Sequence, residues 1–344
     1  MTKFSKLGTG LAMTMLLAVG ISQALAEEKS YVIGVSNTLI GNGWREEMIC
    51  SIKAQAKASG LVKKVILANR NAGPTEQIAD IRNLISAGAN AIIVNPSDRT
   101  ALNSVIKEAA SRGIVVVSVD QAVTAPEAYI VSNDQVAYGA TSAKWLAERL
   151  GGKGSVIEMR GIDGVPADSD RHQGFTDAIK AYPNIKVTTV FNGWSLNTTS
   201  KKTKDIIASG EKVDGIFTTG QDAVVVEAYK TAGIPFPLIV GADNNSFVGQ
   251  LVDLKNAGLT GAAVTNPAAI GGAGLAVALD VLQGKHVDKV VKLDPQVWTN
   301  TDEASVYELK AAYNPSLDPY YSVAVELNPY TTYDTKDVLA CQGP

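Results

Sequence analysis

The chain has 344 residues, of which 46% are hydrophobic and 19% charged, and its formal net charge is -3. This length exceeds the size at which one hydrophobic core usually keeps growing, so we expect two domains. The charge balance provides no basic face, which excludes nucleic acid as an expected partner.

The first 26 residues differ in pattern from the rest of the chain. Two lysines open this segment, an apolar run follows at residues 11–21, and residues 24–26 form a small-residue A-x-A pattern. These are the parts of a secretory signal peptide, and the apolar run is short for a bilayer span. We expect export with cleavage after Ala26, and an uncleaved anchor helix is the alternative.

The two cysteines of the sequence, Cys50 and Cys341, lie near opposite ends of the mature chain. In an oxidising compartment such an isolated pair favours a disulfide, which would tie the C-terminal tail to the first helix. The bridge would stabilise the fold by about a few kcal/mol. Two unpaired thiols are the alternative.

Beyond the leader, short β-branched segments alternate with amphipathic helical segments. Such alternation predicts parallel α/β sheets covered by helices on both faces. The expected strands are residues 31–35, 65–68, 91–94, 114–119, 155–159, 186–191, 215–218, 238–241 and 261–265. Expected helices include one that begins near Trp44, one over 74–88, one capped by Asp98 that runs to Arg112, and one over 267–282.

Counting strand–helix units divides the chain near residues 132–133 into two doubly wound lobes of similar size. We expect residues 27–132 plus about 266–298 in the first lobe and 133–265 in the second. The lobes are then joined by several parallel crossings, which form a hinge about which a cleft closes. Residues from about 299 to 344 form a C-terminal extension that packs back on the lobes, with one further strand at 322–327.

Catalytic motifs are missing from the sequence. It has two histidines, His172 and His286, and lacks HExxH, Cys-rich metal spacing, a nucleophile elbow and a phosphate loop. The glycines at 271, 272 and 274 loosely resemble a nucleotide fingerprint, but they fall inside a helix pattern, which favours close helix packing. We therefore expect no enzymatic activity, no cofactor and no metal.

Polar side chains gather where the predicted strands end, which is where parallel sheets bind ligands. Asp120 and Asp243 each end a strand, and a carboxylate accepts charge-assisted bonds from two adjacent hydroxyls. Amide and guanidinium groups supply further partners, and tryptophan faces suit the C–H faces of a sugar or polyol. The predicted ligand-binding residues are Ser36, Asn42, Trp44, Arg45, Asp120, Gln121, Arg171, Trp194, Gln221, Asp243 and Asn266.

Four of these residues have structural alternatives. Asp120 is a candidate turn cap, and Asn42 a candidate for a left-handed backbone position. Trp194 is a candidate core residue, and Arg171 a candidate partner of Asp168. The joint pattern favours ligand binding, because unrelated structural roles would not place every polar group at the same end of its strand.

Several segments resemble the ribose-binding-like, type I group of periplasmic sugar-binding proteins of ABC importers. They are VSNTLIGNGW, NLISAGANAIIVNPSD, VVVSVDQ, the RxxGF of residues 171–175, IVGADNN and AAVTNPAAIGGAG, and the resemblance covers residues 30 to about 300. It implies a monomeric periplasmic protein that captures a small carbohydrate or polyol and delivers it to an inner-membrane permease. A ligand-dependent sensor that docks on a chemoreceptor or kinase is the alternative.

The resemblance also implies individual roles. Asn42 and Asp120 would hold ligand hydroxyls from the first lobe, and Thr265 and Asn266 would lie at a hinge crossing. From the second lobe the hydroxyls would be held by Arg171, Gln221 and Asp243.

This sequence departs from the ribose-type pattern at three positions. Arg45 stands where the pattern has a second aromatic residue, Gln121 where it has arginine, and Ala242 where it has an aromatic residue. The residues expected to line the pocket therefore differ from the ribose-type set, and the sequence does not predict ribose as the ligand. Arg45 indicates either a more polar or partly anionic ligand or a salt bridge at the rim.

Overall fold

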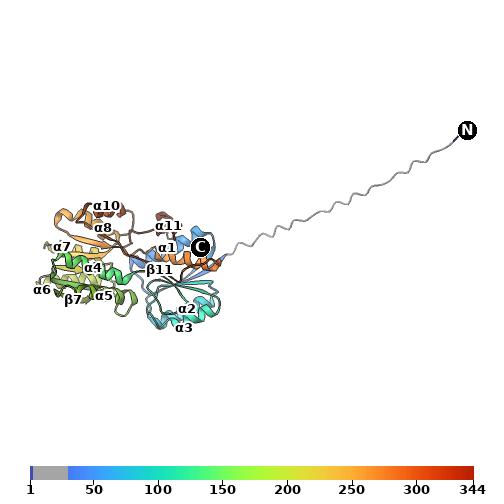
Figure 1. Ribbon diagram of the computed structural model, residues 1–344, viewed down its shortest axis with the longest axis horizontal. Coiled ribbons are helices and arrows are strands. Elements are labelled where there is room, and N and C mark those ends of the chain that lie inside the picture. The colour runs from blue at the N-terminus through green and yellow to red at the C-terminus, as the bar shows by residue number, and fades with distance from the viewer. Residues whose placement is uncertain (3–29) are drawn as a thin grey trace.

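The computed structural model describes residues 1–2 and 30–344, and residues 30–344 form two lobes that each contain a six-stranded sheet (Figure 1). The predicted signal peptide and its cleavage site lie outside the described residues, apart from Met1 and Thr2. None of the described helices combines the length and apolar character needed to cross a membrane.

The first lobe is built on a parallel sheet in the order β2-β1-β3-β4-β5-β11. Its strands are β1 (Tyr31–Asn37), β2 (Val62–Asn69), β3 (Ala91–Val94), β4 (Val115–Asp120), β5 (Tyr129–Asn133) and β11 (Val290–Leu293). The helices α1 (Gly43–Ser59) and α9 (Ile270–Leu282) cover one face, and α2 (Pro74–Ser86) and α3 (Asn103–Ser111) cover the other.

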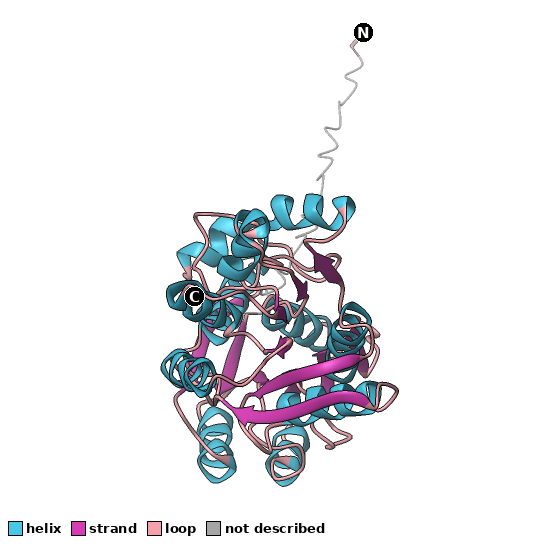
Figure 2. Cartoon of the chain, turned by 90° about the vertical axis from the view of Figure 1, so that its left-hand side faces the viewer, coloured by secondary structure: helices cyan, strands magenta, loops and turns pink. Residues whose placement is uncertain are grey.

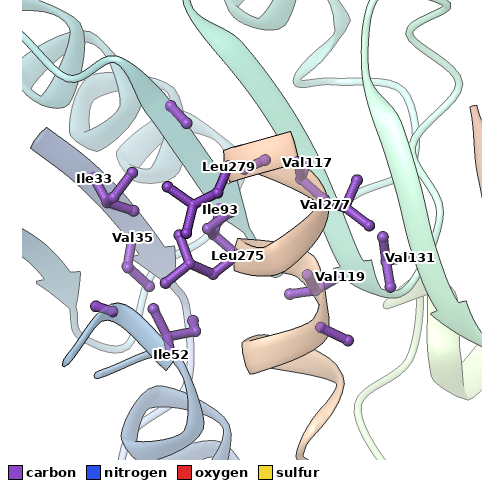
Figure 3. Close-up of a cluster of buried hydrophobic side chains, with 14 of the residues drawn as sticks. Ile33, Val35, Ile52, Ile93, Val117, Val119, Val131, Leu275, Val277 and Leu279 are labelled. Atoms are coloured by element: carbon purple, nitrogen blue, oxygen red, sulfur yellow. The ribbon is translucent and has the colours of Figure 1, made fainter. Parts of the chain in front are cut away.

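Alternation of side chains along each strand fills both faces of this sheet. Ile93 packs against Leu275 of α9, as Figure 3 shows, whereas its neighbour Ile92 packs with Leu84 and Ile106 on the opposite face. Because helices cover both faces of the sheet, its strands are apolar at most positions.

The second lobe repeats this arrangement in the order β7-β6-β8-β9-β10-β12, with β12 antiparallel to β10. Its strands are β6 (Lys153–Arg160), β7 (Asn184–Phe191), β8 (Gly215–Phe217), β9 (Leu238–Ala242), β10 (Gly261–Val264) and β12 (Val297–Thr299). Helices lie on both faces of the sheet (Figure 2). They are α4 (Gln135–Arg149), α5 (Pro166–Ile179), α6 (Leu196–Ser209), α7 (Asp222–Ala232), α8 (Asn245–Asp253), the 3-10 turn η1 (Lys255–Ala257) and α10 (Glu303–Ala312).

The glycines of α9 serve helix packing, as predicted. A Cβ at Gly274 would lie 2.3 Å from Cγ1 of Val119, and one at Gly271 would lie 2.5 Å from the carbonyl oxygen of Met48. Only glycine therefore allows α9 to approach both the sheet and α1 this closely. The nucleotide-fingerprint alternative does not apply.

Within residues 30–344 the chain passes between the lobes four times. The first three passages join β5 to α4, β10 to α9, and β11 to β12. The third lies at residues 294–296, slightly before the expected boundary near 298, because β12 pairs with β10 of the second lobe. The fourth belongs to the C-terminal extension, which runs from α10 on α8 to α11 (Thr335–Ala340) on α1 (Figure 1).

Two local predictions were wrong. Residues 322–327 form no strand, because this segment crosses between lobes and does not follow a sheet edge. Its β-pairing within residues 30–344 is an isolated bridge between Ser322 and Asn244. Asp98 caps a turn before α3, since its Oδ1 accepts from the amides of Thr100 and Ala101.

The predicted disulfide is confirmed. The Sγ atoms of Cys50 and Cys341 are 1.97 Å apart, and the bond joins α1 to the residue that follows α11. The disulfide therefore joins two residues that are separated by 291 positions in the sequence.

Candidate functional site

A cavity lies between the two lobes, beyond the carboxyl ends of their strands. Its empty space amounts to about 520 Å³, part of it open to solvent. Eight of the eleven predicted residues line it, namely Asn42, Trp44, Arg45, Asp120, Arg171, Trp194, Asp243 and Asn266. The common position of strand ends in a parallel sheet is what brings them together.

Three predicted residues lie outside this lining. The hydroxyl of Ser36 is buried in the first lobe, where it accepts from Nε2 of Gln77 at 3.1 Å. Gln121 is buried and bridges the lobes, since its Oε1 accepts from the amide of Ala167 at 2.7 Å. Gln221 lines a smaller adjoining space, and within residues 30–344 its Oε1 has no hydrogen-bond partner.

The carboxylate of Asp120 forms part of the first-lobe wall. Its Oδ1 accepts from Nδ2 of Asn133 at 3.0 Å and from Nε2 of Gln135 at 2.7 Å. Burial raises the pKa of Asp120, while the nearby charges of Arg171 and Arg45 partly offset that rise. The turn-cap alternative is wrong, because this carboxylate accepts from the side chains of Asn133 and Gln135 and not from turn amides.

The carboxylate of Asp243 forms the matching part of the second-lobe wall. Its Oδ2 accepts from the hydroxyl of Ser322 at 2.8 Å, and its Oδ1 accepts from the amide of Asn266 at 3.0 Å. Burial raises the pKa of Asp243 to about 6, although these two donors favour the ionised form. This group therefore changes charge near neutral pH.

Each lobe also contributes a buried arginine. Nη1 of Arg45 donates to Oδ1 of Asn37 at 3.0 Å, and burial lowers the pKa of Arg45 to about 10, a shift that Asp120 opposes. Nε of Arg171 donates to Gln135 at 2.7 Å, and its Cζ lies 4.5 Å from the ring centroid of Tyr138. Both guanidinium groups are thus held in fixed positions at the cavity wall.

Two alternatives for these arginines are excluded by the contacts. Arg45 is only 5% exposed, so it forms no salt bridge at the rim. Asp168 pairs with Arg160 at 2.6 Å and not with Arg171. The cavity wall therefore carries two carboxylates and two guanidinium groups.

Two tryptophans line the cavity, one from each lobe. Nε1 of Trp44 donates to the carbonyl oxygen of Asn266 at 2.6 Å, and Nε1 of Trp194 donates to Oγ1 of Thr219 at 3.0 Å. The ring of Trp194 lies over Gly161, where a Cβ would meet Cε2 at 2.0 Å. Trp194 is therefore a buried residue of the cavity wall.

Backbone strain is concentrated at this site. Asp120 and Trp194 have φ values of 66° and 52°, in the left-handed region that non-glycine residues rarely adopt. Such conformations cost about 1–3 kcal/mol each and persist where surrounding contacts enforce them. These two backbone conformations lower the stability of the fold and orient the side chains of Asp120 and Trp194.

Contacts between the lobes close the cavity. Asn42 caps α1, since its Oδ1 accepts from the amide of Arg45, and its Nδ2 donates across the cleft to the carbonyl of Trp194 at 3.4 Å. Arg99 pairs with Asp170 across the same boundary at 2.6 Å. The left-handed alternative for Asn42 is wrong, because its φ is -120°.

Residues 33–286 match the family described as "Periplasmic binding protein domain". The chain belongs to this family. It is 31% identical over 245 residues to the xylitol-binding protein of Mycolicibacterium smegmatis, covering 70% of this chain and 68% of that protein. It is 26% identical over 268 residues to the ribose import binding protein of Bacillus subtilis, covering 77% and 86%.

The solved structure of an ABC transporter solute-binding protein from Thermobispora bispora superposes with a TM-score of 0.75. The identity is 30%, and the match covers 85% of this chain and 90% of that one. This periplasmic binding protein therefore has the type I fold of two α/β lobes. Proteins of this family bind solutes for transport and are not enzymes.

Sequence reasoning missed several residues of this binding protein's cavity, above all Tyr320 and Ser322. Both come from the C-terminal extension, where no strand end or periodicity indicates a site. Thr219 and Asn244 were also missed, although both follow predicted strands closely and that position was a usable signal.

The described residues contain no group of three or more His, Cys, Asp or Glu side chains placed to hold a metal ion.

Proposed function

We propose that the protein captures a neutral sugar or polyol in the interlobe cavity and delivers it to an ABC permease in the membrane. The observation that carries this proposal is the balanced set of Asp120, Asp243, Arg45 and Arg171 on a buried wall that also contains two tryptophan faces. The ligands named for relatives, ribose and xylitol, belong to the same chemical class.

The charge balance supports a neutral ligand over an anionic one. Two carboxylates offset two guanidinium groups, so an anion would bring an unpaired charge into a buried site, which is costly. Both hydrogen bonds to the Asp120 carboxylate go to Oδ1, which leaves Oδ2 to accept from ligand hydroxyls. Polyhydroxy compounds supply the donors and acceptors that this wall requires.

The energetics are sufficient for micromolar capture, which requires about 8 kcal/mol. Hydrogen bonds to charged groups contribute about 1.5–3 kcal/mol each, from which ordering costs are subtracted. Because the ligand would contact both lobes only when they are closed, binding shifts the equilibrium toward the closed form.

A thermal-shift screen tests the proposal with D-ribose, xylitol, L-arabinose, D-fructose, D-tagatose and D-fucose. We expect at least one compound to raise the melting temperature in a concentration-dependent manner. Absence of a shift with every neutral sugar and polyol, together with a shift by a sugar acid or sugar phosphate, would contradict the neutral-ligand assignment.

The relatives named above are transport and solute-binding proteins, which favours import over a sensor that docks on a chemoreceptor or kinase. Co-purification with the permease from detergent-solubilised membranes, enhanced by the bound sugar, tests the delivery step. Retention by a chemoreceptor or kinase and not by a permease would contradict it.

We also propose that the mature protein is a periplasmic monomer that begins at Glu27. The sequence of residues 1–26 has the features of a signal peptide, and the family is periplasmic. Intact mass of the exported protein checks the cleavage site, and light scattering coupled to size exclusion checks the monomer.

A further inference from the structure

The C-terminal extension contains a segment that spans the cavity. We call residues 313–341 the C-terminal strap. It leaves α10 on the second lobe, passes the cavity at Tyr320 and Ser322, and ends on α1 of the first lobe. Its course brings it close to both walls of the cleft.

The strap is fastened to the second lobe at the start of α8. Nδ2 of Asn245 donates to the carbonyl oxygens of Asn314 and Leu317 at 2.7 and 3.1 Å. The amide of Ser246 donates to the carbonyl oxygen of Pro319 at 2.9 Å. The backbone on the N-terminal side of Tyr320 is thus fixed by hydrogen bonds.

The strap is fastened to the first lobe by a separate set of contacts. Oε1 of Gln55 accepts from the amide of Thr332 at 2.9 Å, and its Nε2 donates to the Thr332 hydroxyl at 3.1 Å. Buried Val338 packs with Cys50, which forms the disulfide with Cys341. The far end is therefore anchored both covalently and by packing.

Ser322 connects the two lobes at the crossing point. Its hydroxyl donates to Oδ2 of Asp243 at 2.8 Å, while its amide donates to Oε2 of Glu47 on α1 at 2.6 Å. Both carboxyl groups are fully buried. Ser322 consequently fixes the orientation of the Asp243 carboxylate within the cavity.

Tyr320 lies in close contact with the start of α1. A Cβ at Gly43 would be 2.6 Å from Cβ of Tyr320, although the backbone of Gly43 is not in the left-handed region. Glycine at this position is therefore explained by the approach of Tyr320. The tyrosine is half-buried and lines the cavity together with Trp44 and Trp194.

We propose that the strap is a third wall of the ligand site. The ring of Tyr320 contacts a C–H face of the bound sugar or polyol, and Ser322 positions the acceptor carboxylate of Asp243. This inference rests on the proposed function and extends it, because it assigns ligand recognition to a segment outside both lobes. Aromatic rings bind such faces through apolar contact at small entropic cost.

Calorimetric titration tests this with the compound that gives the largest thermal shift in the six-member panel. Tyr320→Ala should lower affinity about tenfold and change the preference among panel members, whereas Tyr320→Phe should restore most of the affinity. One control should stay within about twofold of the wild type. Tyr307→Ala removes a tyrosine that is 71% exposed on α10 and lies outside the cavity lining.

The outcomes separate this inference from the proposed function. Wild-type protein that binds no panel member overturns both. Wild-type binding with unchanged affinity and preference in Tyr320→Ala overturns the inference alone. An equal loss in Tyr307→Ala also overturns it, since that tyrosine does not line the cavity. Melting curves of the ligand-free variants show whether each remains folded.

Discussion

The two lobes place the same kinds of side chains at equivalent positions. Each has an arginine on the helix after its first strand, Arg45 on α1 and Arg171 on α5. Each has an aspartate at the end of its fourth strand, Asp120 in β4 and Asp243 directly after β9. The lobes are thus two similar halves of one site, which explains the charge balance of the cavity.

They differ in how the aspartate is held. The partners of Asp120 lie 13 and 15 residues further along the chain, at the first hinge crossing. Those of Asp243 lie 23 and 79 residues further along, at the second crossing and in the C-terminal strap. The second carboxylate therefore depends on a segment added after both lobes are complete.

The largest expected effect is on ligand affinity, and it tests whether the two carboxylates are equivalent. Asp120→Ala and Asp243→Ala should each weaken binding by about a hundredfold or more, since each removes charge-assisted bonds worth about 3 kcal/mol in total. Titration calorimetry measures the loss. Wild-type affinity in either variant would show that its lobe does not hold the ligand through the aspartate.

The next effect concerns the disulfide that anchors the C-terminal strap. The strap contacts Asp243 through Ser322, so the disulfide supports the second carboxylate. Cys50→Ser with Cys341→Ser should lower the unfolding free energy by about 2–4 kcal/mol, because a long loop is no longer closed. Denaturant unfolding measures this difference. Unchanged stability would mean that the packing of α11 on α1 suffices without the bond.

A smaller effect is the pH dependence of affinity. With a pKa of about 6, Asp243 loses its ability to accept from ligand hydroxyls as it becomes protonated, so affinity should fall about tenfold from pH 7 to pH 5. Asp243→Asn should bind more weakly but with a flatter profile. An equally steep profile in that variant would assign the titration to another group.

The raised pKa of Asp243 has the opposite effect on the stability of the ligand-free protein. Asp243 stays protonated in the folded state at pH values above its ordinary pKa of 3.8. The unfolding free energy should therefore fall as pH rises from about 4 to 6. Asp243→Asn should reduce that slope in urea titrations at several pH values.

The smallest effect is expected from the ion pair across the cleft. Arg99→Ala should weaken ligand binding by less than about 1 kcal/mol, since both partners are partly exposed, and the loss should shrink at high salt. Lys201→Ala is the matched control, because Lys201 pairs with Asp205 within α6. A larger loss in the control would contradict the cross-lobe role of Arg99.

Much of the fold was predictable because buried parallel strands have continuous β-branched runs. The expected strand at 91–94 matches β3, and every other expected strand except 322–327 overlaps an observed one. The strands β5, β11 and β12 were not predicted, since each adjoins polar or proline-containing segments. Their pairing is decided by the neighbouring strand.

The site was predictable where residues follow strand ends, as for Asp120, Asp243 and Asn266. A position near a strand end did not, however, decide whether the side chain faces the cavity. Ser36 lies within β1 and points into the first lobe, and Gln121 next to Asp120 bonds the opposite lobe. Whether a side chain at a strand end faces the cavity depends on local φ and ψ and on where the strand stops, which the sequence pattern does not specify.

The sequence by itself determined the two-lobed α/β class, the pairing of the two cysteines, and the carboxylates and tryptophans of the cavity. These follow from periodicity, composition and strand ends, which are local properties. Only the tertiary structure decided that Tyr320 and Ser322 join the site, because their contacts with Gly43, Glu47 and Asp243 span 79 to 277 positions. Such contacts arise from the path of the chain in space, for which no local pattern exists.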